Sequence, residues 1–173
     1  MINRGMIQVF TGNGRGKTSA AMGTVIRAVG YGLKVFAVFF MKGPRDAGEY
    51  SSLGKLGVDF RVTGRPGFLG PTDVQKEDME LAEQALETAY LAMASGNYDL
   101  VVLDEINTAA AWKLVNPNDV LKLIDAKPPA TELILTGRYV PDAFIGRADY
   151  VTELVNIKHP YDKGAPAREG IDY

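Results

Sequence analysis

A glycine-rich stretch near the start of the chain, residues 11–19, reads TGNGRGKTS and has the composition of a phosphate-binding loop. Gly16-Lys17-Thr18 fits the end of the pattern G-x-x-x-x-G-K-[ST], whereas Thr11 stands where that pattern begins with glycine. Glycines let backbone N–H groups approach phosphate oxygens, and the N-terminus of a following helix adds partial positive charge. Lys17 would reach a terminal phosphate, and the Thr18 hydroxyl would bind magnesium. The stretch therefore predicts a site for a magnesium-bound triphosphate, with a glycine-rich turn that binds nothing as the alternative.

Two carboxylates follow an apolar run further along the chain, in the sequence LVVLDE at residues 100–105. Asp104 and Glu105 would lie at the carboxyl end of a buried strand, where open α/β sheets bind ligands. Carboxylate oxygens bind magnesium directly or through water. We therefore expect this pair to form the second half of a nucleoside-triphosphate site, although charged residues can also simply mark the end of a strand.

Four further charged residues are candidates for the same edge of the sheet. Arg138 ends the run LTGR, and its guanidinium suits a phosphate, a carboxylate or the edge of a base. Lys42, Arg45 and Glu49 follow the second expected strand. They either line a ligand cleft or are solvated loop charges, and a surface position is also open for Arg138.

The sequence leaves the roles of one aromatic residue and one histidine undecided. Phe68 lies in a loop rich in glycine and proline, where it either stacks on a planar ligand or anchors the loop in the core. His159 is the single histidine, and we expect it to be a hydrogen-bonded structural residue rather than a ligand or a base.

Short apolar runs that alternate with helical patterns position these residues, and this alternation is typical of a parallel α/β sheet. We expect a phosphate-loop NTPase-like, recombinase-like three-layer sandwich whose mostly parallel sheet has about six strands. The expected strands are residues 6–10, 34–41, 58–62, 98–105, 132–137 and 150–157. The expected helices are residues 17–29, 116–126 and 141–147, a long helix from Thr72 to Gly96 with a Thr72–Gln75 capping box, and at most a short one near 51–56.

Composition limits the function. The 173 residues, 46% hydrophobic and 23% charged, suit a single domain, residues 1–173, with one core. The net charge of −2 argues against bulk electrostatic binding to nucleic acid or to an anionic membrane. The absence of cysteine excludes disulfides and thiolate chemistry. The apolar run at residues 35–41 is too short to cross a bilayer.

Taken together, the motifs resemble those of the phosphate-loop type of ATP:corrinoid adenosyltransferase. The resemblance covers nearly the whole chain, and in that family the loop itself reads T-G-N-G-[KR]-G-K-T, so that Thr11 is a family feature. The tail has no general phosphate-loop meaning yet is similar to the end of this family. The stretches that carry the resemblance are VFTGNGRGKTS, FMKG, GE at 48–49, GF at 67–68, YDLVVLDEIN, TELILTGR and TELVNIKHPYDKGAPAREGIDY.

The resemblance implies a reaction at the far end of ATP. A cobalt(I) corrinoid attacks the 5′-carbon of the ribose, and the whole triphosphate leaves, as part of adenosylcobalamin biosynthesis or corrinoid salvage. The family binds ATP in the reverse direction relative to ordinary phosphate-loop enzymes. No protein nucleophile or general base is needed, because cobalt(I) is itself the nucleophile.

The resemblance also implies residue roles. Lys17 would neutralise the triphosphate, while Thr18 and Glu105 would hold magnesium with support from Asp104. Phe68 matches an aromatic residue that helps to remove the lower ligand of cobalt, although this chain has Gly70 where many members have tryptophan in GFTW. The residues implied to contact the substrates are Gly12, Asn13, Gly14, Arg15, Gly16, Lys17, Thr18, Ser19, Phe68 and Arg138.

A flavoprotein reductase as partner, a homodimer and a cytoplasmic location are further expectations from the resemblance. Two other readings of the residues are an ordinary phosphate-loop ATPase or small-molecule kinase, and a nucleotide sensor without catalysis. Thr11 and the tail favour the adenosyltransferase through the resemblance alone.

Overall fold

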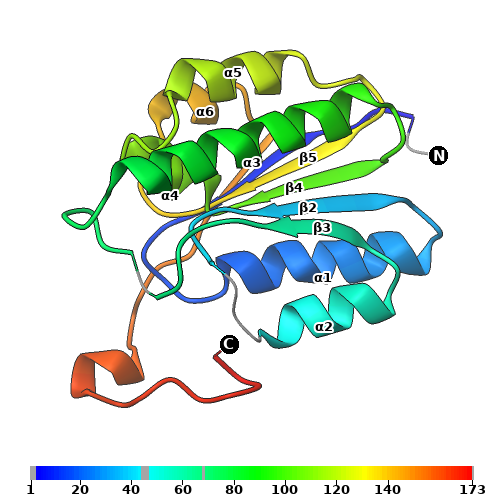
Figure 1. The fold of residues 1–173 in the computed structure, drawn as a ribbon. Coiled ribbons are helices and arrows are strands. Elements are labelled where there is room, and N and C mark those ends of the chain that lie inside the picture. The colour runs from blue at the N-terminus through cyan, green and yellow to red at the C-terminus, as the bar shows by residue number, and fades with distance from the viewer. Residues whose placement is uncertain (1–2, 44–46, 68, 173) are drawn as a thin grey trace.

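The computed structural model describes residues 3–43, 47–67 and 69–172. Six strands form one sheet in the order β3-β2-β4-β5-β1-β6, and every neighbouring pair is parallel. Helices α1 and α2 cover one face of the sheet, and α3 to α6 lie on the other side (Figure 1). The elements are β1 (Ile7–Thr11), α1 (Lys17–Gly30), β2 (Val35–Phe39), α2 (Gly48–Lys55), β3 (Asp59–Val62), α3 (Lys76–Ala94), β4 (Leu100–Asp104), α4 (Ile106–Ala111), α5 (Pro117–Asp125), β5 (Glu132–Thr136), α6 (Asp142–Ile145) and β6 (Tyr150–Glu153).

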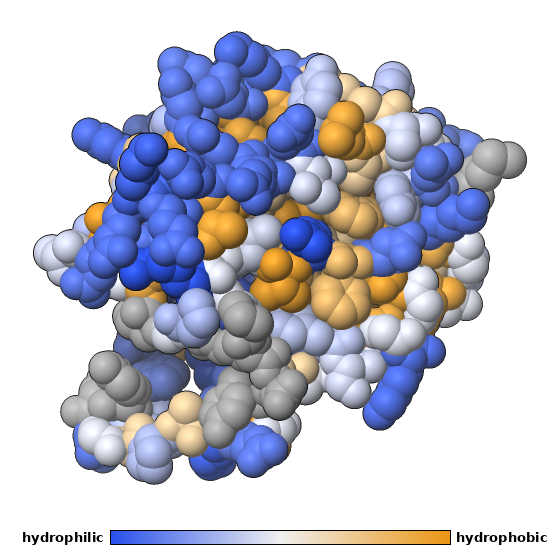
Figure 2. Space-filling model, viewed as in Figure 1, coloured by the Kyte–Doolittle hydropathy of each residue, from blue (hydrophilic) through white to orange (hydrophobic). Residues whose placement is uncertain are grey.

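The central strands are apolar on both faces because helices cover both. In β4, Val101 and Leu103 pack in the cluster under α3 and α5, whereas Leu100 and Val102 pack against α1 on the other face. All five residues of β4 are buried. Such continuous apolar runs are the expected pattern for central strands of a covered parallel sheet. Figure 2 shows that hydrophilic side chains dominate the outer surface over α3 and α5, which agrees with the layering.

The strand register brings the candidate residues together. Phe39 pairs with Asp104, so the chain leaving β2 emerges beside the carboxyl end of β4. Phe10 pairs with Thr136, which places the loop after β1 next to the end of β5. The carboxyl ends of β1, β2, β4 and β5 therefore meet at one edge, where ligands bind in this class of sheet.

The start of the long helix α3 differs from the expectation. The helix begins at Lys76, not at Thr72, and its N-cap is Gln75. The Asp78 carboxylate accepts a 2.8 Å hydrogen bond from the Gln75 N–H, and the Gln75 side chain accepts one from the Asp78 N–H. The capping box is thus formed by Gln75 and Asp78 rather than by Thr72 and Gln75, because Asp78 is also held by a neighbouring arginine, Arg65.

Other elements depart from the expectation in length or in kind. Strand β6 ends at Glu153 rather than at residue 157, and α4 was not expected at all. Helix α4 contains three alanines and is almost wholly buried, so it shows no amphipathic period. After β6 the chain turns away from the sheet and forms a short 3-10 helix, Pro160–Lys163, in the lower lobe of Figure 1. Across residues 3–43, 47–67 and 69–172, no helix has the length and apolar character that a membrane crossing requires.

Candidate active site

Thr11 is part of strand β1, and this explains why the loop tolerates threonine at that position. The Thr11 side chain is buried, and its carbonyl accepts a 2.8 Å hydrogen bond from the Leu154 N–H. The left-handed backbone comes one residue later, at Gly12 with φ 94°, and again at Gly16 with φ 114°. Thr11 is not among the residues with a positive φ, so the backbone at position 11 does not require glycine.

Leu154, directly after β6, lies against the loop. Its carbonyl accepts a 2.6 Å hydrogen bond from the Gly14 N–H. A Cβ added at Gly14 would lie 2.7 Å from that same carbonyl oxygen, and one added at Gly12 would also collide with it. The two glycines therefore allow the close approach of the Leu154 backbone, in addition to any role toward a ligand.

Lys17 is buried inside the loop. Its ammonium donates hydrogen bonds to the carbonyl oxygens of Gly12 at 2.9 Å and Gly14 at 2.8 Å, and only 6% of the residue is exposed. Burial lowers the pKa of Lys17; Glu105 opposes this effect and the positive charge of Arg138 adds to it. The lysine is thus held in the concave side of the loop, among charges of both signs.

Asp104 forms the centre of a small buried polar cluster. It is fully buried, and one carboxylate oxygen accepts a 2.7 Å hydrogen bond from the Thr136 hydroxyl. The other oxygen accepts a 3.3 Å hydrogen bond from the Thr18 hydroxyl and lies 2.6 Å from the Lys42 ammonium. Burial disfavours the charge on Lys42, but the Asp104 carboxylate outweighs burial and raises the pKa of Lys42.

Glu105 is the first residue after β4 and has a left-handed backbone, with φ 65°. Its N–H donates a 3.0 Å hydrogen bond to the Thr136 hydroxyl, and its carboxylate accepts one of 2.7 Å from the Thr108 hydroxyl. The Thr108 oxygen also accepts a 2.8 Å hydrogen bond from the Arg138 N–H. Glu105 was expected inside the strand; this turn and the two threonines instead set the direction of its side chain.

The remaining candidate residues lie at the surface, and not all of them face Lys17. Asn13, Ser19 and Arg138 are exposed. Arg15 turns toward the C-terminal segment, where its guanidinium donates to the Ile171 carbonyl and lies 3.1 Å from the Asp172 carboxylate. The structure therefore does not bring the Arg15 side chain to Lys17.

Of the residues with open roles, Lys42 belongs to the site. Glu49 lies in the first turn of α2, and His159 directly precedes the 3-10 helix. Arg45 and Phe68 lie outside the described residues.

The oxygen atoms around Asp104 fit a small cation. The Thr18 hydroxyl and an Asp104 carboxylate oxygen are hydrogen-bonded, and the Lys42 ammonium lies within 3.3 Å of both. Hydroxyl and carboxylate oxygens are the ligands that magnesium prefers. Among the described residues no three carboxylate or imidazole groups converge on one point, so a magnesium ion here would need oxygens from its ligand or from water.

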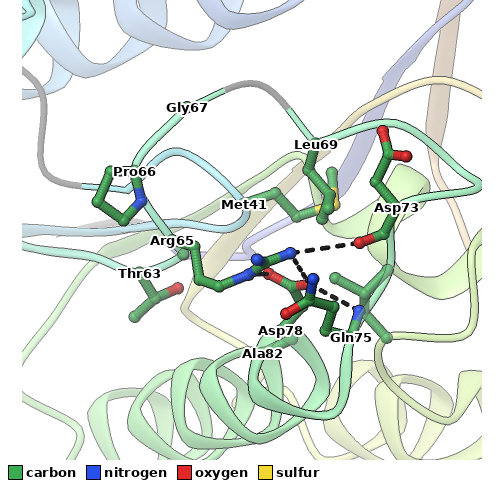
Figure 3. A pocket seen from close by; sticks show the side chains of 12 residues that line it. Met41, Thr63, Arg65, Pro66, Gly67, Leu69, Asp73, Gln75, Asp78 and Ala82 are labelled. Carbon is green, nitrogen blue, oxygen red and sulfur yellow. Dashed lines mark hydrogen bonds and ion pairs between the residues drawn. The ribbon is translucent and has the colours of Figure 1, made fainter.

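A cavity of about 210 Å³ lies beside this site, under the loop of residues 63–75 (Figure 3). Met41, Leu69 and Leu114 contribute to its apolar lining. Arg65 crosses it and binds both carboxylate oxygens of Asp78 at 2.7 Å. The Arg65 hydrogen bond holds the pKa of the Asp78 carboxyl below its usual range. The pair thus links Arg65, in the first part of this loop, to the start of α3.

Comparison with known proteins agrees on family and fold. The family model described as ATP:corrinoid adenosyltransferase BtuR/CobO/CobP matches residues 3–173. A corrinoid adenosyltransferase of Escherichia coli K12 is 39% identical over 170 residues, which cover 98% of this chain and 86% of the relative. One from Pseudomonas aeruginosa PAO1 is 37% identical over 172 residues, which cover 98% and 84%.

Among solved structures, the KaiC-like protein PH0186 of Pyrococcus horikoshii OT3 matches with a TM-score of 0.57 at 17% identity, covering 90% of this chain and 75% of that one. At this identity the match concerns the fold alone. Together with the six parallel strands, it confirms the predicted phosphate-loop, recombinase-like α/β fold.

Proposed function

The chain belongs to the ATP:corrinoid adenosyltransferase family, and from that premise we propose how its residues transfer the 5′-deoxyadenosyl group of ATP to the cobalt(I) of a corrinoid. The protein is a transferase, and the family does not favour an ordinary phosphate-loop ATPase or kinase. In the transfer, a cobalt–carbon bond forms at C5′ as the bond from C5′ to the triphosphate oxygen breaks. The electron pair of that broken bond leaves with the triphosphate.

The charge arrangement at the carboxyl edge of the sheet carries this proposal. Lys17, Lys42 and Arg138 bring three positive charges to a region that holds two carboxylates, Asp104 and Glu105. The excess of one positive charge favours a polyanion. Groups placed in advance around a developing negative charge stabilise the transition state. Lys17 and the loop N–H groups would therefore stabilise the triphosphate as it leaves, without any protein nucleophile.

Magnesium is the proposed cofactor, held by Thr18 and Asp104 with Glu105 close by. The hydrogen bond between the Thr18 hydroxyl and Asp104, and the hydroxyl of Thr136 behind that carboxylate, support this set of ligands. When bound, the ion would supply positive charge to the phosphate oxygens. Thr108 keeps the Glu105 carboxylate near the site through its 2.7 Å hydrogen bond.

The exposed and glycine residues of the loop would complete the triphosphate site. We assign its contacts to the backbone from Gly12 to Ser19, apart from the Gly14 N–H, which donates to the Leu154 carbonyl, and we place Asn13 at the exposed rim. Arg15 would have to leave Asp172 to reach the phosphates, because its guanidinium lies 3.1 Å from the Asp172 carboxylate. Arg138 would approach from the end of β5.

The corrinoid would lie against the loop of residues 63–75. The cavity of about 210 Å³ under this loop is smaller than the sites of drug-sized ligands, which measure about 300–1,000 Å³, so it cannot enclose a corrin ring. The ring would instead stay outside, where Phe68 would help to displace the lower ligand of cobalt. Removal of that ligand makes reduction to cobalt(I) accessible to a flavoprotein reductase.

A homodimer in the cytoplasm, with residues 1–173 as one domain, completes the proposal. Exposed apolar side chains in the segment after β6 support a contact between copies, since Val155 and Ile157 are 67% and 94% exposed. Isolated apolar side chains on a surface are common, but a group in one segment is typical of an interface.

Anaerobic incubation with ATP, magnesium and chemically reduced cobalamin tests the proposed function. We expect loss of the cobalt(I) absorption, a light-sensitive adenosylated product and release of intact triphosphate. ADP and phosphate as the only products, with the cobalt(I) spectrum unchanged, would overturn it.

A further inference from the structure

The Lys42 ammonium occupies a position between the two oxygen atoms proposed to bind magnesium. It lies 2.6 Å from Asp104 Oδ2 and 3.3 Å from Thr18 Oγ1, and these two oxygens are themselves 3.3 Å apart. The Lys42 side chain is 21% exposed and the Asp104 side chain is 0% exposed. A lysine therefore supplies positive charge at this point.

The backbone before and after Lys42 is fixed, so this contact is part of the fold. Met41, directly before it, has a left-handed φ of 58°, which turns the chain at the end of β2. The N–H groups of Lys42 and Gly43 both donate to the Thr63 carbonyl, at 2.9 and 3.3 Å. A Cβ at Gly43 would collide with the Arg65 carbonyl, so the chain after the lysine is closely packed as well.

We infer that Lys42 is a resident cation: it fills the metal position while nucleotide is absent, and it is exchanged for magnesium when the magnesium-bound triphosphate arrives. The inference rests on the proposed magnesium role of Thr18 and Asp104. A buried carboxylate without a counter-charge is strongly unfavourable, and the Lys42 ammonium, 2.6 Å from Asp104, supplies that counter-charge in a folded protein without metal.

The exchange depends on nucleotide because of the charges involved. A bare magnesium ion that displaced Lys42 would leave an ammonium beside a divalent ion, without its carboxylate partner. A triphosphate brings several negative charges, which offer the displaced ammonium a new partner. Metal binding is therefore expected to be weak without the triphosphate and strong with it, as a ligand can shift an equilibrium only through its differential affinity for the two states.

The test measures Mn²⁺ binding by electron paramagnetic resonance, without nucleotide, in wild-type protein and in Lys42→Met. Wild-type protein should show no defined site, whereas Lys42→Met should bind one Mn²⁺ at least about tenfold more tightly, a difference of about 1.4 kcal/mol. Combining Lys42→Met with Asp104→Asn should abolish that site. Lys55→Met, at an exposed lysine at the end of α2, is the matched control and should behave as wild type.

Thermal unfolding provides a second readout. Lys42→Met should unfold at a lower temperature than wild type, and magnesium alone should restore much of that loss, while wild-type protein should not respond. If Lys42→Met does not fold, Lys42→Gln replaces it, because its amide can still donate to Asp104 without carrying charge. A defined Mn²⁺ site in wild-type protein without nucleotide would overturn the exchange. So would Lys42 variants that bind no Mn²⁺ and whose unfolding temperature does not respond to magnesium.

A third arm separates this inference from the proposal on which it depends. Wild-type protein should bind Mn²⁺ in the presence of ATP, and Asp104→Asn should weaken that binding. If that holds and Lys42→Met still binds no metal alone, the exchange is wrong and the metal site stands. If Asp104→Asn has no effect with ATP, the metal role of Asp104 is wrong and the exchange is wrong with it.

Discussion

The Leu154 carbonyl accepts a 2.6 Å hydrogen bond from the Gly14 N–H, so a residue from the end of the chain holds the loop near its start. The Leu154 N–H donates to the Thr11 carbonyl at 2.8 Å, which makes the contact two-sided. The chain directly after β6 therefore fixes the glycine-rich loop of residues 11–19 through both backbone groups of Leu154.

Gly14→Ala should disturb this contact and impair catalysis. The new Cβ would lie 2.7 Å from the Leu154 carbonyl oxygen, so the loop must shift. Because displacement of positioning groups is costly, we expect kcat/KM for ATP to fall about 10- to 100-fold. Gly23→Ala is the control, since a Cβ there meets nothing within 4 Å. It should leave turnover unchanged and stabilise α1 by about 1 kcal/mol. Equal activities of the two variants would contradict the role of Leu154.

Lys17→Met should remove the main charge that, under the proposed function, faces the leaving triphosphate. The loss of one such group is expected to lower kcat on the order of 100-fold or more, with weaker ATP binding. Lys55→Met, on the exposed end of α2, controls for the change in net charge. Steady-state rates with preformed cobalt(I) and calorimetric ATP binding measure the two effects. A Lys17→Met enzyme with wild-type rates would refute the assignment of the loop.

Several strands could be predicted from the sequence because burial on both faces leaves a continuous apolar run, as in β4. The loop could be placed because its glycines and Lys17 are neighbours in the chain. The contact between Gly14 and Leu154 could not be predicted from the sequence, because no local pattern links residues so far apart in the chain. The predicted start of α3 was wrong because several polar residues in this segment can cap a helix. Only the ion pair with Arg65, which the sequence does not reveal, favours Asp78 as a member of the capping box.

The hydroxyls behind the carboxylates were also missed. Thr136 and Thr108 hold Asp104 and Glu105, but a threonine in a buried strand or helix gives no signal of its role. The sequence does not decide whether Lys42 lines a ligand cleft or is a solvated loop charge. The deciding feature is the turn at Met41, and a positive φ at a non-glycine residue is not readable from composition.

The Arg65–Asp78 pair should make stability depend on pH in acid. The lowered pKa of Asp78 means that the unfolded chain binds protons more readily than the folded one. The contribution of the pair is therefore complete above the ordinary aspartate pKa, about 3.9, and is lost as the pH falls through the lowered folded value. Urea unfolding of wild type and Arg65→Gln from pH 6 to pH 3 should show a shallower loss of stability in the variant.

Asp119→Asn is the control for that series, because its pair with Lys122 is exposed and screened by solvent. Loss of the Asp119–Lys122 pair should change the free energy of unfolding at neutral pH less than Arg65→Gln does. Parallel acid profiles for wild type and Arg65→Gln would show that Asp78 gains nothing from Arg65.

Phe68→Ala should separate reduction of the corrinoid from transfer of the adenosyl group. If Phe68 displaces the lower ligand, the variant should lose more activity in an assay with reductase and cobalt(II) than in one with preformed cobalt(I). The second assay controls for damage to the ATP site. Equal losses in both assays would mean that Phe68 acts elsewhere.

The position of Leu154 also has a consequence for synthesis of the protein. The loop of residues 11–19 leaves the ribosome well before β6 and the Leu154 that holds it. Contacts between segments so distant in the chain form late in folding. A nascent chain that ends before β6 therefore has the residues of the loop without its shape. Under the proposed function, the growing polypeptide would gain the ability to hold ATP only after Leu154 has been made and has reached the loop.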